Sequence, residues 1–379
     1  MARWLIYGAT GYTGRLIVRD ALARGHRPVL AGRSSEVAAL AAQHNCHHRV
    51  FGLDVPDLAA ELRGVTGVCH VAGPFTATSA PMMAACLAAG VHYIDLATEL
   101  EVFERAAGHH DEAVRRGVLL MPGSGFNVAV TDAVAVALHE SLPDADHLTL
   151  AVDFGETRHS YGGTVMGIEA LAAGVRVREH DQIRRIPSGS RQRLIPLAAG
   201  ARRMATLPFP FGDPITARHS TGIPNIEIYL PASHAGAAGY RIAGLLRHLI
   251  ATGVGQRALK RMAHLMFAAP DAPEARARVR TVVWGEVRNP AGETAALELT
   301  TRHSYEVTSE VAVRAMEAIS EAPAGGGFRT PGSLLDGRRF LDTLTGIVIN
   351  PITRRGPTAD AGPGTGTDAR PGARKGAGP

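Results

Sequence analysis

The chain has 379 residues, of which 45% are hydrophobic and 20% charged, a composition typical of a folded globular protein. Its length is sufficient for two domains. Lys and Arg number 40 against 35 Asp and Glu, and three of the five excess positive charges fall in residues 351–379, so the charge balance does not favour nucleic-acid binding. The three cysteines form no CxxC pair and no apolar run reaches 18 residues; this disfavours zinc binding and a transmembrane segment, and predicts a cytoplasmic location.

The first 125 residues alternate between short apolar runs, each closed by Gly, Asp or Pro, and longer amphipathic stretches. This alternation predicts strand–helix–strand units and a parallel sheet. The expected strands are 3–7, 28–31, 49–53, 67–72, 92–96 and 118–121. The expected helices are 14–25, 35–43, 79–90 and 99–116.

Beyond residue 144 the pattern changes to longer runs in which apolar and polar residues alternate. Such runs predict a mixed or antiparallel sheet with one accessible face, and the Asn289–Gly292 turn predicts a hairpin. The expected strands are 148–154, 226–230, 279–287 and 295–301, and the expected helices are 162–174, 304–320 and 334–345.

Four segments follow from this division. Residues 1–143 are predicted to form the first domain, 144–325 an α+β domain, and 326–350 a helical return to the first domain. Residues 351–379 hold seven Gly and five Pro and are predicted to be disordered.

A glycine-rich loop follows the first expected strand and opens the first expected helix. Glycine at its three spaced positions suits a tight turn, close approach to a pyrophosphate, and helix–strand packing, while the helix N-terminus favours an anion. A structural turn in a nucleotide-free domain is the alternative. The predicted dinucleotide-binding residues are Gly8, Ala9, Thr10, Gly11, Tyr12, Thr13 and Gly14.

Arg33 ends the second expected strand, where an NAD-specific fold usually carries an acidic residue for the ribose. Its guanidinium fork fits a 2′-phosphate, so Arg33 with Ser34 predicts NADP(H) as the cofactor, the alternative being a solvated surface arginine. Asp54, after the third strand, is predicted to contact the adenine or to be a loop aspartate. Gly73, Pro74 and Phe75 follow the fourth strand and are predicted to line the nicotinamide.

Several short segments of the sequence together carry a family resemblance: residues 7–14, 31–34, 72–75, 92–99, 123–127 and Asp132. They resemble the saccharopine dehydrogenase-like oxidoreductases, and within them the branch containing trans-acting enoyl reductases. The resemblance covers about residues 1–350 and is dense in the first 135 residues. It implies a Rossmann fold, that is, a doubly wound parallel sheet binding NADP(H), with an inserted α+β domain for substrate and homodimer contacts.

The chain departs from that family at Asn127, where an aspartate is usual, so a charged contact is missing there. No catalytic residue has a characteristic spacing. Weak candidates for the proton donor are Tyr93, Asp95 and Glu99, although a capping role suits the two acids better. Further candidates from the second domain are His159, Tyr161 and His219.

The sequence lacks the residues that a short-chain dehydrogenase or a zinc site requires. No tyrosine is followed four residues later by lysine, which excludes the standard short-chain dehydrogenase mechanism. The His47–His48 and His109–His110 pairs lack zinc-ligand spacing, so no metal site is expected.

These observations predict an NADP(H)-dependent oxidoreductase that transfers a hydride to a C=C bond of a lipid-like or carrier-linked metabolite. The alternatives are an imine reductase or dehydrogenase of the saccharopine type, and an NADP-sensing regulator without turnover. Residues 240–269 are helical, apolar and basic, and are read either as a membrane-surface helix or as a core-facing helix with a basic outer face.

Overall fold

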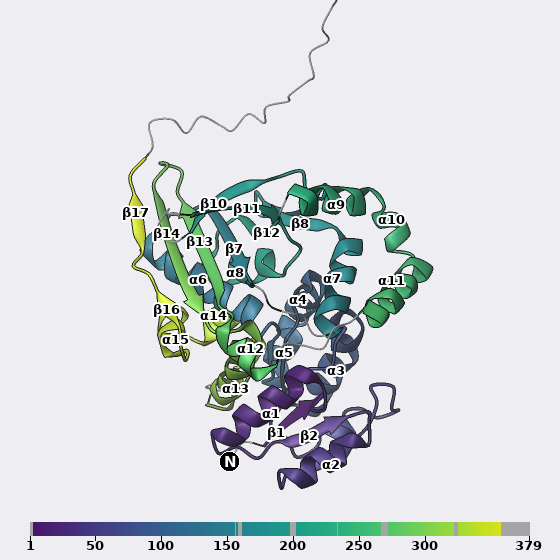
Figure 1. Cartoon of the computed structure of the whole chain (residues 1–379). Helices are drawn as coiled ribbons and strands as arrows, with labels where there is room; N and C mark the ends of the chain where they lie inside the picture. Colours follow the sequence, from purple (N-terminus) through teal and green to yellow (C-terminus); the bar gives the residue numbers. More distant parts are fainter. Residues whose placement is uncertain are drawn as a thin grey trace, which may run out of the picture.

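The computed structural model describes residues 3–155, 157, 161–197, 202–232, 234–266, 272–321 and 325–357. Two sheets organise these residues, the first at the bottom and the second at the top of Figure 1. None of the helices described is long and apolar enough to cross a membrane.

The first sheet has seven strands in the order β15-β6-β5-β4-β1-β2-β3, all parallel. The strand order reverses between β1 and β4, the point at which doubly wound sheets bind their ligands. Its predicted strands are confirmed, whereas the two-residue β15 was not predicted. The strands are β1 (Trp4–Tyr7), β2 (Val29–Gly32), β3 (His48–Val50), β4 (Gly67–His70), β5 (His92–Asp95), β6 (Leu119–Met121) and β15 (Gly327–Phe328).

Helices cover both faces of this sheet, which is why β1, β2 and β4 are buried along their whole length. On one face lie α1 (Tyr12–Ala23), α2 (Glu36–Gln43) and α13 (Ser304–Glu321). On the other lie α3 (Phe75–Ala89), α4 (Leu100–Gly108) and α5 (His110–Arg116), with the short 3-10 helix η1 (Ala60–Leu62).

Helix α13 lies beside α1, although the two are far apart in the sequence (Figure 1). Its Ala312 and Met316 are buried with Ile17 and Val18 of α1. The predicted boundary at residue 325 assigned this helix to the second domain, but it packs on the first sheet.

The second sheet is mixed, as predicted, with the strand order β10-β11-β12-β7-β13-β14-β16. The predicted hairpin around Asn289–Gly292 is confirmed, because β13 and β14 pair antiparallel across it. The strands are β7 (His147–Asp153), β8 (Val175–Glu179), β9 (Gln182–Ile186), β10 (Arg193–Leu197), β11 (Arg202–Pro208), β12 (Asn225–Pro231), β13 (Thr281–Arg288), β14 (Thr294–Thr301), β16 (Val348–Ile349) and β17 (Thr353–Arg355).

Two sequence predictions need correction here. The strands β8 to β11 were not predicted. The tail was predicted to be disordered from residue 351, but β17 pairs with β14; residues 358–379 lie outside the described residues.

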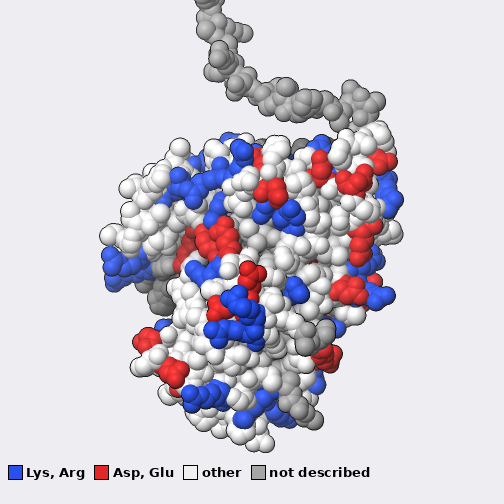
Figure 2. Space-filling view, turned by 180° about the vertical axis from the view of Figure 1, so that it is seen from behind, with Lys and Arg blue, Asp and Glu red and all other residues white. Residues whose placement is uncertain are grey.

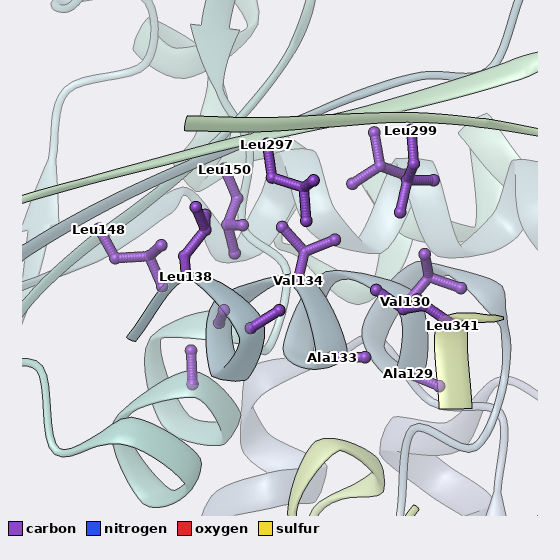
Figure 3. Packing of buried hydrophobic residues seen from close by; sticks show 14 of the residues in the cluster. Ala129, Val130, Ala133, Val134, Leu138, Leu148, Leu150, Leu297, Leu299 and Leu341 are labelled. Carbon is purple, nitrogen blue, oxygen red and sulfur yellow. The ribbon is translucent and has the colours of Figure 1, made fainter. Parts of the chain in front are cut away.

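Helix α6 (Phe126–Ser141) connects the two sheets and forms the centre of the largest apolar cluster. Figure 3 shows its Val130, Val134 and Leu138 facing leucines of β7 and β14. The other helices are α7 (Tyr161–Ala173), α8 (Asp213–Thr221), α9 (His234–Leu245), α10 (Arg247–Ile250), α11 (Gly253–Met266), α12 (Pro273–Arg278), α14 (Pro331–Leu334) and α15 (Gly337–Thr343).

Candidate functional site

The glycine loop lies at the carboxyl end of β1, directly beside the chain that leaves β4. Gly8 has a φ of +91°, and a Cβ there would lie 3.0 Å from the backbone nitrogen of Ala72. A Cβ on Gly14 would lie 2.2 Å from the carbonyl oxygen of Gly8. The loop therefore packs so tightly that glycine is required at both positions, and it occupies the switch point of the sheet.

Helix α1 begins inside this loop without a side-chain cap, because its N-cap residue is Gly11. Gly11 donates to the Gly8 carbonyl oxygen, but the amides of Tyr12 and Thr13 donate to no acceptor within the described residues. These amides and the positive end of the helix dipole fit a diphosphate. Ala9 and Thr10 lie in the same turn between β1 and α1.

The Tyr12 side chain fastens the loop to the C-terminal part of the chain. Its hydroxyl accepts from Arg276 Nη1 at 3.0 Å, and its ring meets Tyr305 edge-on at 5.0 Å. Burial raises the pKa of Tyr12, so the phenol stays neutral. Arg276 in turn pairs with Glu306 at 2.8 Å, which holds the loop against α12 and α13.

Arg33 is exposed directly after β2, and Asp54 is exposed four residues after the end of β3, so both follow the carboxyl ends of neighbouring strands, on the same side of the sheet as the loop. The guanidinium of Arg33 makes no hydrogen bond or ion pair with any described residue. The two charges lie near the Tyr7 hydroxyl: burial raises the pKa of Tyr7, Arg33 lowers it and Asp54 raises it. Ser34 Oγ accepts from the Glu36 amide at 3.2 Å. A free guanidinium at this position fits the predicted 2′-phosphate contact.

Gly73, Pro74 and Phe75 join β4 to α3, with Gly73 exposed and Pro74 as the N-cap residue of the helix. Behind this turn lies His70, which was not predicted as a site residue. The Thr78 hydroxyl donates to the Ala72 carbonyl oxygen at 2.8 Å, so His70 Nε2 donates to Thr78 Oγ1 at 3.0 Å.

The fully buried His70 thereby keeps its other ring nitrogen, Nδ1, without a partner. Burial lowers its pKa to about 3, so the imidazole is neutral. Its ring meets Phe75 edge-on at 5.6 Å and supports the turn from behind. A polar residue in the last position of a strand at the switch point is the only sequence feature that indicates this role.

Tyr93 and Asp95 are buried and paired with each other. The Tyr93 hydroxyl donates to Asp95 Oδ2 at 2.6 Å, and Asp95 Oδ1 accepts from the amides of Ala97 and Gly123, both at 2.9 Å. Burial raises the pKa of Asp95 to about 6 and that of Tyr93 well above its usual value. With both oxygens of its carboxyl group bonded, Asp95 holds the turns after β5 and β6.

Glu99, the N-cap residue of α4, has a different environment. Oε2 accepts from the Thr98 amide at 2.8 Å, whereas Oε1 is buried without a partner. Burial, followed by the negative charges of Asp95 and Glu169, raises the pKa of Glu99 to about 7. An isolated β-bridge joins the backbone of Glu99 to that of Phe211, which lies between β11 and α8. Glu99 therefore lies where the segments around the two sheets meet.

The other proposed donors lie elsewhere or are not described. The His219 ring meets the Phe328 ring edge-on, with 4.8 Å between the ring centres, and burial lowers the pKa of His219. His159 lies outside the described residues, and Tyr161 begins α7 with a side chain that is not described. Asn127 lies in the first turn of α6, where its carbonyl oxygen accepts from Thr131.

Two further buried acids were missed as titratable groups. Asp132 on α6 accepts from Ser220 at 2.8 Å and from the Gly332 amide at 2.7 Å, so it links α6 to α8 and α14. Asp213 begins α8 with neither carboxyl oxygen bonded, and burial raises its pKa to about 7. In the described part of the chain, no three His, Cys, Asp or Glu gather as a metal site.

The tight glycine loop, uncapped helix and free guanidinium at the switch point define a dinucleotide-binding domain of the doubly wound class. Residues 4–121 match the family model of the saccharopine dehydrogenase NADP binding domain. Residues 4–121 are therefore similar to NADP-binding domains of the saccharopine dehydrogenase type, which confirms the predicted resemblance and cofactor.

Curated relatives share only part of their length with this chain. A probable mitochondrial saccharopine dehydrogenase-like oxidoreductase of Arabidopsis thaliana is 29% identical over 142 residues, covering 32% of this chain and 31% of the relative. A trans-acting enoyl reductase of Mycobacterium leprae is 32% identical over 138 residues, covering 34% and 33%. The matches thus span about a third of these relatives.

The whole architecture also has a counterpart of known structure. Saccharopine dehydrogenase (L-Glu forming) of Saccharomyces cerevisiae aligns with a TM-score of 0.62 over 94% of this chain and 100% of its own, at 10% identity. That similarity shows the fold: a Rossmann-like parallel sheet followed by a second, mixed sheet, as predicted.

Proposed function

We propose that the protein is an NADP(H)-dependent oxidoreductase that reduces a C=C bond of a lipid-like or carrier-linked metabolite. The observation that carries the proposal is the meeting of the glycine loop, the uncapped start of α1 and the free Arg33 guanidinium at one edge of the first sheet. This arrangement holds a dinucleotide, and the match to an NADP-binding family supports the same cofactor.

Each part of the edge then has a binding role. The amides of residues 8–14 hold the diphosphate, Arg33 and Ser34 hold the 2′-phosphate, and Asp54 accepts from the adenine. Residues 73–75 lie against the nicotinamide half, with His70 supporting their turn. Bound NADPH supplies a hydride; the protein must supply orientation and a proton.

Glu99 is the proposed proton donor. With a pKa of about 7, its carboxyl group is half-protonated near neutral pH, as a general acid requires. Because Oε2 already accepts from the Thr98 amide, the proton resides on the unpartnered Oε1. Reduction of an enoyl group takes a hydride at one carbon and this proton at the other. Asp95 has no such free oxygen and positions the turns instead.

The surroundings of Glu99 favour an uncharged, apolar reacting group over an amino-acid imine. Its neighbours include the carboxylates of Asp95 and Glu169, which repel the carboxylates of a saccharopine-type substrate. Apolar side chains are also near: Phe211 forms the bridge to Glu99, and Met166 Sδ accepts from the Thr98 hydroxyl at 2.7 Å. The relatives named trans-acting enoyl reductases support the same substrate class.

The test is the loss of NADPH absorbance with an α,β-unsaturated acyl thioester, and with a cyclic imine in parallel. We expect turnover with the thioester, and a fall in kcat as pH rises through about 7, because Glu99 then loses its proton. Glu99→Gln should lower kcat by roughly 10²- to 10⁴-fold with the NADPH Kd unchanged. Glu104→Gln, an exposed acid on the same helix, is the matched control and should behave as wild type.

The other outcomes separate the alternatives. Turnover of the imine alone supports a saccharopine-type dehydrogenase. NADPH binding without turnover of either substrate supports a sensor. Full activity of Glu99→Gln overturns its role as the donor.

A further inference from the structure

Helices α9, α10 and α11 (residues 234–266), which we term the helical arm, form an arc at the right of Figure 1. All three pack against α7, and α9 also packs on the loop between β9 and β10, where Arg241 Nε donates to the Gly189 carbonyl oxygen at 3.0 Å. The arm therefore has one attached side and one free side.

Charge is distributed very unevenly in this segment. Residues 228–270 contain no Asp or Glu, although the whole chain has 35. The arm itself carries five Lys and Arg, as many positive charges as the net charge of the entire chain. Figure 2 shows the molecule from behind, where the edge formed by the arm, now at the left, is white and blue. The five cations are Arg241, Arg247, Arg257, Lys260 and Arg261.

Large aliphatic side chains are exposed on the same segment. Leu245 is 82% exposed, Val254 69%, Leu249 66% and Ile242 58%, and Leu246 is exposed as well. Among the described residues, five of the nine exposed large hydrophobic side chains thus fall between 242 and 254. Exposed apolar clusters of this kind mark interaction surfaces.

The backbone gives four of these side chains a common face. Ile242, Leu245, Leu246 and Leu249 have the i, i+3, i+4, i+7 spacing of one helical stripe. Helical bonding continues across the junction of α9 and α10, because the Leu246 amide donates to the Ile242 carbonyl oxygen at 3.0 Å and the Ile250 amide to Leu246 at 3.0 Å. The stripe therefore points to solvent as a unit.

We propose that the helical arm docks on an anionic lipid surface, with the aliphatic stripe in the acyl boundary and the exposed Arg257 and Arg261 against lipid phosphates. Each half of this arrangement matches the surface: aliphatic side chains partition into the interface, and an acid-free basic segment is attracted to anionic headgroups. The docking does not depend on the proposed reaction. Because the arm packs on α7, and α7 reaches Thr98 through Met166, docking also places the candidate site near the lipid.

The test is sedimentation of the full chain with vesicles of phosphatidylcholine, pure or mixed with phosphatidylglycerol. We expect binding to the mixed vesicles and its loss in high salt. Leu245→Ser combined with Leu249→Ser should weaken binding at least ~10-fold, because two inserted side chains are lost. Arg257→Gln combined with Arg261→Gln should weaken binding to the mixed vesicles by a similar factor.

The control pair is Leu194→Ser with Val348→Ser, which are 59% and 64% exposed and lie outside the arm. It should bind vesicles as wild type does, and every variant should keep the NADPH Kd, which reports folding. In a Leu249→Trp variant, mixed vesicles should shift the indole emission to the blue. Absence of vesicle binding, or equal loss in the arm and control pairs, overturns the proposal. A change of mass in light scattering without vesicle binding assigns the stripe to self-association instead.

Discussion

The carboxyl edge of the first sheet and the charged face of the second sheet differ in whether their polar groups have hydrogen-bonding or ion-pair partners. On the second sheet, Arg193 donates to Thr149 and to Glu286, both at 2.7 Å, and Arg191 pairs with Glu179 and Glu227. At the edge of the first sheet, the Arg33 guanidinium, the first amides of α1 and Glu99 Oε1 have no partner among the described residues.

This difference distinguishes polar groups that stabilise the fold from polar groups that remain available to bind a ligand. The face of the second sheet lines a hollow of about 360 Å³, yet three of the four arginines there, Arg178, Arg191 and Arg193, already have carboxylate partners, so it offers less to an anionic ligand than unpaired arginines would. The edge of the first sheet keeps hydrogen-bonding capacity that folding alone leaves unused. Polar groups without partners are rare in folded proteins, and where they gather at a switch point they indicate a ligand site.

Asp213 is the hardest test of that view, because it is buried and unpartnered but belongs to α8 and not to a strand end or loop of the first sheet. Its pKa rises from 3.8 in a model peptide to about 7, so the folded protein holds this proton more tightly than the unfolded chain does. The contribution of Asp213 to stability therefore falls as pH rises between about 4 and about 7, by at most about 4 kcal/mol.

Asp213→Asn removes that titration and keeps the shape. We expect the variant to match wild type in urea unfolding near pH 4 and to exceed it by several kcal/mol at pH 8. Asp111→Asn, at an exposed position, should show no such pH-dependent gain. If the difference in stability between Asp213→Asn and wild type were the same at pH 4 and pH 8, Asp213 would not carry a raised pKa.

Gly14→Ala tests the close packing of the nucleotide edge. The new Cβ would lie 2.2 Å from the Gly8 carbonyl oxygen, which is a backbone atom, so no flexible side chain can move aside. We expect a loss of about 1–3 kcal/mol in stability and at least ~10-fold in NADPH affinity, measured by urea unfolding and calorimetry. Gly108→Ala, where no atom lies within 4 Å of the new Cβ, should leave NADPH affinity unchanged and should not lower stability, because Ala favours the helix over Gly by up to about 1 kcal/mol.

The two regions also differ in how far the sequence predicts them. Strands of the first sheet are short apolar runs closed by residues such as Gly8 or Asp95, so local patterns suffice. In the second sheet, β8 and β9 carry Arg176, Arg178, Arg184 and Arg185 at positions that look solvated in the sequence. The pairing of β8 with β9 becomes favourable only in the folded chain, where Arg176 meets Glu101 and Arg178 donates to the Pro214 carbonyl oxygen.

In the candidate site too, the sequence predicts local features but not those that depend on contacts between distant residues. The phosphate loop could be predicted because Gly8 and Gly14 act through their own backbone. Asp95 and Glu99 could not be told apart, because the surroundings of Glu99 include Phe211 and the charge of Glu169, which come from distant parts of the sequence. His70 was missed because its role depends on Thr78 and the turn between them.

Arg33→Ala measures the free guanidinium directly. A charged hydrogen-bonding group facing a phosphate contributes about 1.5–3 kcal/mol, so NADPH affinity should fall roughly 10- to 100-fold while NADH affinity changes little. Arg27→Ala is the matched control, because Arg27 is exposed at the opposite end of the same strand. Equal losses for NADPH and NADH would show that Arg33 does not select the 2′-phosphate.

Arg193→Gln tests the paired face, where the smallest effect is expected. Its side chain is 39% exposed and that of Glu286 is 22% exposed, so solvent screens the pair and its loss should cost only about 0.5–1 kcal/mol in urea unfolding. A double-mutant cycle with Glu286→Gln isolates that interaction from the bond to Thr149. The NADPH Kd should not change. If Arg193→Gln weakened NADPH as much as Arg33→Ala does, paired and unpaired arginines would contribute alike, and the absence of partners would no longer locate the site.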